Sequence, residues 1–402
     1  MIDSLNLIQE RLIANVNISH YRFLYAQFNT RNRLSGLVGP RGVGKTTLLL
    51  QYLKNHPELL PEVCYFSADH IYFSQITLYA FMEELYLTAG KKIFFIDEIH
   101  KYDNWAQELK NIYDGFPSIK IVFSGSSSLD LIKGSYDLSR RAVLNYLPGM
   151  SFREYLNFHE NMQIEVVSYQ QLLDSSHDLS RVIHRIDRIK GLFQDYLRQG
   201  YYPFALEDSL TYHQRLLRII DKTVFEDIAN FYKLKTENLH LFKKILVFLA
   251  SIPPGRVNTH NIAKNLAVND HTVSNYLTIL KETGLIHMIY SFEGGNVSLR
   301  KPEKIFLNNT NLQYTLEDSF GKTVEIGTIR ELFFIQMLLN SQKNVYFSER
   351  GDYCIDDRVF EIGGANKTRK QIQENAKAIL VKDDLTSIRN KIIPLIYFGF
   401  LY

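Results

Sequence analysis

The amino-acid sequence predicts an α/β protein, because short apolar strands and helical segments alternate in its first part. An apolar strand, a glycine-rich loop and an amphipathic helix follow one another over residues 33–55. A second apolar strand ends in two carboxylates within residues 91–102, and a third runs into small hydroxyl residues within 119–130. Polar residues therefore follow each of the three predicted strands.

Length and charge narrow the class of protein. A chain of 402 residues with 46% hydrophobic residues is too long for one core, which suggests two to four globular domains. Lys and Arg total 46 against 43 Asp and Glu, and the net charge of +3 is too small to mark the whole chain as a nucleic-acid binder. The two cysteines, Cys64 and Cys354, favour core packing in a reducing compartment over a disulfide framework.

The start of the chain carries Asp3 and Glu10 and lacks the basic head and apolar segment of a secretion signal. No stretch of about 18 apolar residues is present to span a membrane. We therefore expect a cytoplasmic protein without a membrane partner.

Residues 39–46 fit the pattern GxxxxGK[ST], with a strand before and a helix after. Such a loop needs glycine where backbone N–H groups surround phosphate oxygens, lysine to reach the outer phosphates, and a hydroxyl for Mg²⁺. Gly42, Lys45 and Thr46 take these roles. The alternative is a glycine-rich turn before an ordinary helix, which the order of strand, loop and helix makes the weaker interpretation. The residues expected to contact the nucleotide are Gly39, Pro40, Arg41, Gly42, Val43, Gly44, Lys45, Thr46 and Thr47.

The strand in residues 91–102 ends in Asp97 and Glu98. We predict that Asp97 and Thr46 hold the metal, and that Glu98 is the catalytic base that polarises a water for attack on the γ-phosphate. On its own, this segment would also fit a core strand that ends in a solvated Asp–Glu pair.

Two further groups are candidates for contact with the γ-phosphate. Ser124 and Ser126 follow the third strand and could reach the γ-phosphate or its water, or could equally cap the next helix. Arg140 and Arg141 could act as an arginine finger from the same chain or from a second copy, or could be ordinary surface arginines. We predict Ser126 and Arg141 as catalytic residues together with Glu98.

The segments GPRGVGKTT, FFIDEIHKYDNW, FSGSSS and LSRRAVLNYLPGMSFREYL, in this order, resemble the AAA+-type P-loop ATPases of bacteria and archaea that carry a C-terminal domain of unknown function. The resemblance covers residues 15–160. It implies an ATP-binding αβα sandwich with a helical lid, and ATP and Mg²⁺ as ligands. The roles given above to Lys45, Thr46, Asp97 and Glu98 carry over directly. Arg141 fits the family's arginine, although Arg140 stands where relatives often have glycine.

Residues 151–236 show helical spacing, and YLRQGYYPFAL resembles a signature of the family's lid. Residues 237–300 predict three helices and a hairpin, the outline of a winged helix-turn-helix, with a recognition-type helix over 271–283 closed by Gly284. The exposed start of this helix could hydrogen-bond base edges but brings no positive charge. DNA binding, protein docking and a purely structural role therefore stay open. The polar residues at the start and the basic residues that could flank it are Asn269, Asp270, His271, Ser274, Asn275, Arg256, Arg300, Lys301 and Lys304.

Residues 301–402 predict a further α/β unit, with a helix over 368–381 and a last strand over 392–402. This region resembles the restriction-endonuclease-like PD-(D/E)xK fold, in which Asp352 and Glu361 would occupy the carboxylate positions. The lysine of that motif is replaced by Gly363, and the nearest substitutes are Lys367 and Lys370. A nuclease with a relocated lysine and an inactive nuclease-like domain are both possible. We favour the inactive domain.

The sequence thus predicts a P-loop ATPase core over residues 1–150, a helical lid over 151–236, a winged helix over 237–300 and a nuclease-like domain over 301–402. The predicted function is hydrolysis of ATP with Mg²⁺ to drive or gate conformational change in the C-terminal domains. The alternatives are a nucleotide-gated DNA-binding module with slow hydrolysis and a metal-dependent nuclease. Besides ATP, DNA and a protein client are possible partners.

Overall fold

The computed structural model forms two compact units, Met1–Gly149 and Met150–Tyr402. Four residues named above, Ser126, Arg256, Arg300 and Lys370, lie outside the part of the chain that the structure describes. The described residues are 2–125, 138, 140–174, 177–253, 255, 259–292, 301–321, 325–368, 372, 375, 377–389 and 391–402.

A five-stranded sheet is the centre of the first unit. Its strands are β1 (Leu34–Val38), β2 (Val63–Ser67), β3 (Ile93–Asp97), β4 (Lys120–Gly125) and β5 (Val143–Tyr146). They lie in the order β2-β3-β4-β1-β5, and every neighbouring pair is parallel. β1 and β3 are buried along their whole length, which explains why both read as unbroken apolar runs in the sequence. The predicted α/β class is confirmed for this unit.

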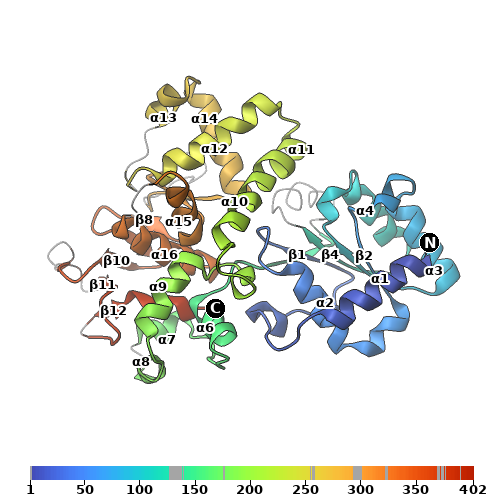
Figure 1. The fold of residues 1–402 in the computed structure, drawn as a ribbon, viewed down its shortest axis with the longest axis horizontal. Coiled ribbons are helices and arrows are strands. Elements are labelled where there is room, and N and C mark those ends of the chain that lie inside the picture. Colours follow the sequence, from blue (N-terminus) through green and yellow to red (C-terminus); the bar gives the residue numbers. More distant parts are fainter. Residues whose placement is uncertain are drawn as a thin grey trace. The chain divides into compact units, whose positions relative to one another are not determined.

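Helices cover both faces of this sheet. The connection from β1 to β2 crosses the sheet in the opposite direction to the connections from β2 to β3 and from β3 to β4. Because such crossovers are right-handed, α2 packs on one face, whereas α3 and α4 pack on the other. α1 packs against α2 and β2 on the first of these faces (Figure 1). These helices are α1 (Ile2–Asn15), α2 (Lys45–Asn55), α3 (Leu78–Ala89) and α4 (Trp105–Gly115), and the short 3-10 helices are η1 (Phe23–Ala26), η2 (Pro57–Glu62), η3 (Ile71–Ser74) and η4 (Ile99–Lys101).

The second unit begins with a helical stretch that packs against the end of the chain. α6 contacts η9, while α9 and α10 both contact α15. The hydroxyl of Ser151 and the guanidinium of Arg153 both donate to the backbone oxygen of Tyr402, at 2.6 and 2.9 Å. The elements of this stretch are α6 (Phe152–His159), α7 (Tyr169–Leu173), α8 (His177–His184), α9 (Ile189–Gln199), η5 (Pro203–Leu206), α10 (Tyr212–Lys222), the π-helix η6 (Thr223–Ile228) and α11 (Ala229–Tyr232).

Three helices and a two-stranded sheet follow: α12 (Thr236–Ala250), α13 (Thr259–Leu266), α14 (Asp270–Glu282), β6 (Ile286–Ile289) and β7 (Lys304–Leu307). The side chain of Asn269 accepts from the backbone N–H of Thr272 at 2.7 Å and so caps the start of α14. Gly284 follows its end with φ +72°, as expected for a C-cap glycine. β6 and β7 pair antiparallel, so this small sheet crosses the predicted domain boundary at residue 300.

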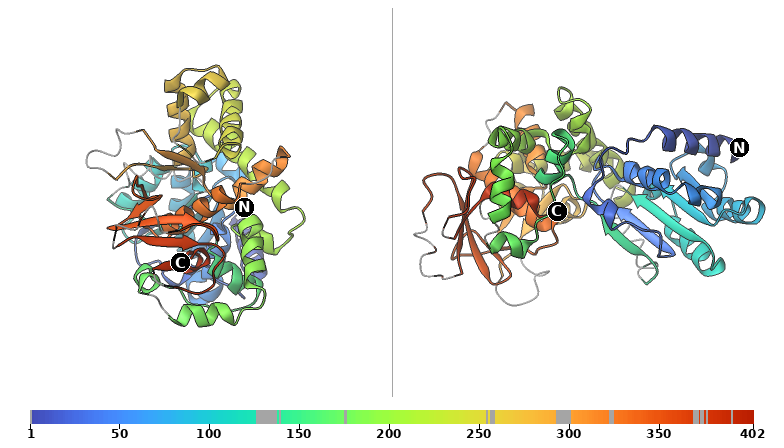
Figure 2. Two further views of the ribbon diagram at one scale, coloured as in Figure 1. Left: turned by 90° about the vertical axis from the view of Figure 1, so that its left-hand side faces the viewer. Right: turned by 90° about the horizontal axis from the view of Figure 1, so that it is seen from below.

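The last part of the chain contains a mixed sheet in the order β12-β11-β10-β9-β8. β10, β11 and β12 run parallel, whereas β8, β9 and β10 pair antiparallel. The left-hand view of Figure 2 shows these red and orange strands side by side. The elements are α15 (Thr310–Ser319), α16 (Ile326–Asn340), β8 (Tyr346–Phe347), β9 (Tyr353–Ile355), β10 (Arg358–Gly363), β11 (Ile379–Lys382), β12 (Ile392–Pro394) and η9 (Leu395–Phe400).

Two predicted elements of this region are wrong in part. The end of the helix predicted over 368–381 is strand β11, because the sheet offers its apolar residues a buried place between β10 and β12. The strand predicted over 392–402 ends at Pro394, which cannot donate to a ladder, and continues as the buried 3-10 helix η9. No helix among the described residues combines the length and apolar character that crossing a membrane requires.

Candidate nucleotide-binding site

The loop at residues 39–44 joins the carboxyl end of β1 to the first residue of α2. Gly42 and Gly44 have φ of +85° and +95°, a backbone region that favours glycine. A Cβ on Gly39 would lie 2.1 Å from the backbone oxygen of Leu147, so no side chain fits there. The backbone amides at the start of α2 therefore form an anion-binding end of the kind that phosphate groups occupy.

Two buried cations lie at this loop. The ammonium of Lys45 donates to the backbone oxygens of Gly39 and Pro40, both at 2.9 Å. Arg22, which the sequence analysis did not single out, donates to the backbone oxygens of Val43 and Pro148 at 2.5 and 2.7 Å. Arg22 thus links the loop to the segment that follows β5, and no spacing rule in the sequence could have revealed this long-range contact.

The carboxylate of Asp97 joins three elements at the carboxyl edge of the sheet. Thr46 at the start of α2 donates its hydroxyl to Oδ2 of Asp97 at 2.6 Å. Ser124 of β4 donates to Oδ1, and the phenol of Tyr65 on β2 donates to Oδ2 at 3.1 Å. The structure therefore brings together the two predicted metal-binding residues, Thr46 and Asp97. It also adds Tyr65 to the group.

Tyr65 is suited to a fixed donor role. Burial first, and then the charge of Asp97, raises the pKa of the Tyr65 phenol, so the phenol stays protonated at neutral pH. The phenol and the hydroxyls of Thr46 and Ser124 together hold the carboxylate in one orientation. Nothing in the segment VCYFS of β2 distinguishes this tyrosine from an ordinary core residue.

Glu98 lies in different surroundings from Asp97. Its side chain is 25% exposed, whereas Asp97 is 3% exposed. The backbone N–H of Glu98 donates to Ser124 at 3.1 Å. The buried Asp97 is therefore placed to hold a metal beside Thr46, and the more open Glu98 is placed to meet a water.

A site for Mg²⁺ would need ligands from outside the protein. Among the described residues, no group of three or more His, Cys, Asp and Glu side chains could hold a metal ion. Thr46 and Asp97 nevertheless fit Mg²⁺, which keeps several waters and commonly binds through one or two protein oxygens and the phosphates of its nucleotide.

Arg141 is not part of this group. Its Nε and Nη2 donate to the two carboxylate oxygens of Asp114 at the end of α4, both at 3.0 Å. Arg141 precedes β5, which runs parallel to β1, so it lies at the amino edge of the sheet, whereas the loop lies at the carboxyl edge. A strand of five residues separates these edges by about 16 Å. This placement does not fit a finger that acts on the nucleotide of the same chain.

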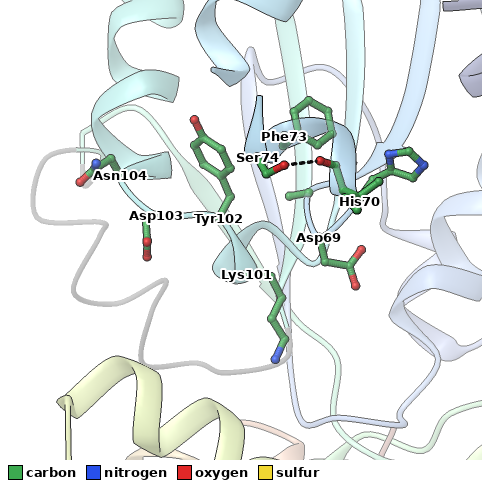
Figure 3. Close-up of a pocket in the computed structure, with 10 residues that line it drawn as sticks. Asp69, His70, Phe73, Ser74, Lys101, Tyr102, Asp103 and Asn104 are labelled. Atoms are coloured by element: carbon green, nitrogen blue, oxygen red, sulfur yellow. Dashed lines mark hydrogen bonds between the residues drawn. The ribbon is translucent and has the colours of Figure 1, made fainter. Parts of the chain in front are cut away.

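A cavity of about 500 Å³ opens near the carboxyl ends of β2 and β3. Figure 3 shows its wall, which combines aromatic rings with the charged side chains of Asp69, Lys101 and Asp103. Lys101 belongs to η4, the short helix that directly follows Glu98. A concave surface therefore lies beside the segment that carries the predicted catalytic base.

A second cluster of charged side chains lies in the mixed sheet. Ile362 donates its backbone N–H to the carboxylate of Asp352 at 2.7 Å, which sets Asp352 beside Glu361 of β10. The ammonium of Lys367 lies 2.5 Å from Oε1 of Glu361. A Cβ on Gly363 would lie 2.3 Å from the Cβ of Lys367. The stem of Lys367 thus fills the space above Gly363.

The pKa values of this pair reflect their contact. Burial raises the pKa of Glu361, and the hydrogen bond from Lys367 only partly offsets that rise. For Lys367, burial works to lower the pKa, but the hydrogen bond and charge of Glu361 outweigh it, so the pKa is raised. Lys367 therefore stays an ammonium next to the carboxylate.

The face predicted to meet DNA carries little positive charge. Asp270 begins α14 and lies 3.4 Å from His260, and Asn275 contacts His271 at 3.2 Å. Lys304 is buried and paired with Glu331 at 2.7 Å, so it does not flank this helix as an exposed cation. Lys301 is exposed. The described residues thus add no electrostatic support for DNA binding to the hydrogen-bonding groups noted in the sequence.

Comparison with known proteins agrees with the arrangement of the loop and the sheet. Residues 31–156 match the family described as AAA domain, and residues 190–322 match a domain of unknown function, DUF8612. An uncharacterized protein of Methanocaldococcus jannaschii is 29% identical over 409 residues, which cover 93% of this chain and 85% of that protein.

Two solved structures illustrate the structural similarity. The replication initiator DnaA bound to AMPPCP and single-stranded DNA is 15% identical, with 69% of this chain and 86% of that chain covered and a TM-score of 0.31. The ADP complex of S. cerevisiae Hsp104 is 14% identical, with 69% and 38% covered and a TM-score of 0.29. Both TM-scores are low.

Proposed function

We propose that the chain hydrolyses ATP with Mg²⁺ to change the conformation of residues 150–402. The premise is the match of residues 31–156 to an AAA domain of the P-loop ATPase type, followed by a match to a domain of unknown function. An AAA domain implies binding and hydrolysis of ATP. The observation that carries the proposal is the 2.6 Å hydrogen bond from Thr46 to Asp97, which joins the phosphate loop to the strand that ends at Glu98.

Each residue has a separate role in this proposal. The amides of residues 42–46 and the ammonium of Lys45 bind the phosphates, and Thr46 and Asp97 hold Mg²⁺. When bound, Mg²⁺ neutralises charge on the phosphate oxygens. Glu98 accepts a proton from the attacking water. Ser124 supports both carboxylate-bearing residues, since it donates to Asp97 and accepts from the backbone of Glu98.

Arg141 is proposed as a finger that acts on the nucleotide of a second copy. The support is its place at the amino edge of the sheet, away from the loop of its own chain. Its contact with Asp114 is half-exposed, and a pair of this kind contributes about 1 kcal/mol or less, so a phosphate can replace it. Ser126 stays a predicted catalytic residue outside the described part of the chain.

The direct test is steady-state release of phosphate from ATP. We expect turnover with Mg²⁺ and loss of turnover on chelation with EDTA, restored by added Mg²⁺. If Arg141 acts on a second copy, turnover per chain should rise with protein concentration, and Arg141→Ala should remove that rise. Turnover that persists in excess EDTA would contradict the metal role, and a flat concentration dependence would contradict the finger.

DNA cleavage by residues 301–402 is a second candidate function, because one observation favours it. The ammonium of Lys367 reaches Glu361 across Gly363, so the cluster contains a carboxylate pair and a cation despite the missing motif lysine. A cation there could stabilise a hydroxide or the charge that develops on a phosphate. The prediction of an inactive domain and this alternative lead to different results in one assay.

That assay follows the conversion of supercoiled plasmid by the full chain with Mg²⁺ or Mn²⁺. If the domain is a nuclease, Lys367→Ala and Glu361→Gln should each lower cleavage by about 100-fold or more, as expected when electrostatic stabilisation or a metal ligand is removed. Lys377→Ala is the matched control, because this lysine is exposed and its ammonium pairs with the exposed carboxylate of Asp357. A wild-type chain that leaves the plasmid intact supports the inactive domain.

A further inference from the structure

The backbone at Glu98 forms a left-handed turn. Its φ of +51° and ψ of +40° are uncommon for a residue with a side chain, and such conformations are strained. The backbone N–H of Lys101 donates to the oxygen of Glu98 at 2.9 Å and closes the turn. The turn therefore folds residue 100 back toward the side chain of residue 98.

The turn places the side chain of His100 beside the carboxylate of Glu98. Its Nε2 is 3.4 Å from Oε2 of Glu98, and its side chain is only 2% exposed. Oε2 is itself buried and has no partner in hydrogen-bonding geometry within the described part of the chain. A buried carboxylate oxygen without a donor is unfavourable, and the ring nitrogen Nε2 of His100 is a potential donor that lies beside it.

We propose that His100 is a positioning residue for the ATP hydrolysis proposed above, on which this inference rests. Its Nε2–H holds Oε2 of Glu98, so that Oε1 is the oxygen that meets the attacking water. His100 transfers no proton and contacts neither nucleotide nor water. It acts only by removing rotational freedom from the carboxylate, which matters because a base must be aligned with the proton that it accepts.

The position of His100 suits this role better than a role in ATP binding. It follows β3 by three residues and is carried by η4, whereas the groups expected to bind the phosphates lie on the loop before α2. A positioning role predicts an effect on kcat without an effect on ATP affinity. A role in ATP binding, or in the packing of β3, predicts that both change.

Two variants of similar volume separate these cases. His100→Leu removes the donor, and we expect kcat to fall about 10- to 100-fold, the range found when outer partners of reactive groups are removed, with the KM and Kd for ATP within twofold. His100→Gln keeps an N–H donor and should stay within about fivefold of the wild-type kcat. In the Glu98→Gln background, His100→Leu should not lower kcat further. His100 acts only through the carboxylate of Glu98, and that carboxylate is already absent in this background.

The outcomes are distinct. A wild-type chain without ATP turnover overturns the proposed function together with this inference. If the wild type is active, an unchanged kcat in His100→Leu overturns this inference alone. Equal losses in His100→Leu and His100→Gln, or a parallel loss of ATP affinity, show a packing role and overturn it as well. Should His100→Leu fail to fold, judged by its thermal midpoint, His100→Gln decides: a kcat more than fivefold below wild type overturns the proposal.

Discussion

Lys45→Ala is expected to abolish measurable ATP binding. Lys45 is buried at the loop, where its ammonium donates to the backbone oxygens of Gly39 and Pro40. Hydrogen bonds to charged groups contribute about 1.5–3 kcal/mol each. The loss of contacts to the outer phosphates should therefore weaken ATP affinity by about 100-fold or more. Calorimetric titration with ATP in a buffer containing Mg²⁺ measures this change.

Lys92→Ala is the matched control for this experiment. Lys92 precedes β3 at the amino edge of the sheet, is half-exposed, and pairs with Glu62 at 2.9 Å. Its replacement removes the same charge from the same unit at the edge that lies away from the loop, so ATP affinity should stay within about twofold. If Lys45→Ala changed neither the ATP affinity nor the thermal midpoint, the loop would be ruled out as the phosphate site.

Glu98→Gln should bind ATP and fail to hydrolyse it. Glutamine keeps the volume of the side chain but cannot accept a proton from water, and a general base contributes about 100- to 10,000-fold to a rate. We expect kcat to fall at least 100-fold with ATP affinity within about threefold. Glu62→Gln, which alters an exposed carboxylate at the other edge of the sheet, should keep normal turnover. Normal turnover in Glu98→Gln would reject the assignment of the base.

The same variant tests the coupling to residues 150–402. Because it should hold ATP without hydrolysing it, it isolates the ATP-bound state. We expect that ATP changes the pattern of limited proteolysis within residues 150–402 of Glu98→Gln, and that ADP produces a different pattern. Identical patterns with ATP, ADP and no nucleotide would leave an ATPase that is not coupled to its second unit.

The nucleotide site could be predicted because its signals are local. The loop from Gly39 to Thr46 and the pair Asp97–Glu98 are each contiguous, and the chemistry of phosphate and metal binding dictates their residue types. Parallel strands then bring these segments to one edge of the sheet. The hydrogen bond from Thr46 to Asp97, 51 residues apart in the sequence, is the result.

The residues that sequence reasoning missed reach the site through long-range packing. Tyr65 contacts Asp97 only because β2 lies beside β3, and Arg22 contacts the loop from a segment without any motif. The placement of Arg141 has a similar cause. Arg141 lies far from the loop because the chain enters β5 at the amino edge of the sheet. Spacing along the chain does not show at which edge a strand begins.

In the C-terminal region, tertiary context overrides local pattern. The apolar residues at 379–381 end a stretch with helical spacing, yet they lie in β11 because a place between two strands buries them better. The two glycines at 363 and 364 do not open onto free space, because the stem of Lys367 lies over Gly363 and the guanidinium of Arg330 lies against Gly364.

The packing of Lys367 over Gly363 makes the two positions an either-or pair. A Cβ at 363 would lie 2.3 Å from the Cβ of Lys367, so the backbone as it stands holds a side chain at only one of these two positions. Related chains should therefore co-vary at these sites: a chain with lysine at the third position of the tripeptide should carry glycine four positions later. Gly363→Lys should accordingly require Lys367→Gly to keep this packing.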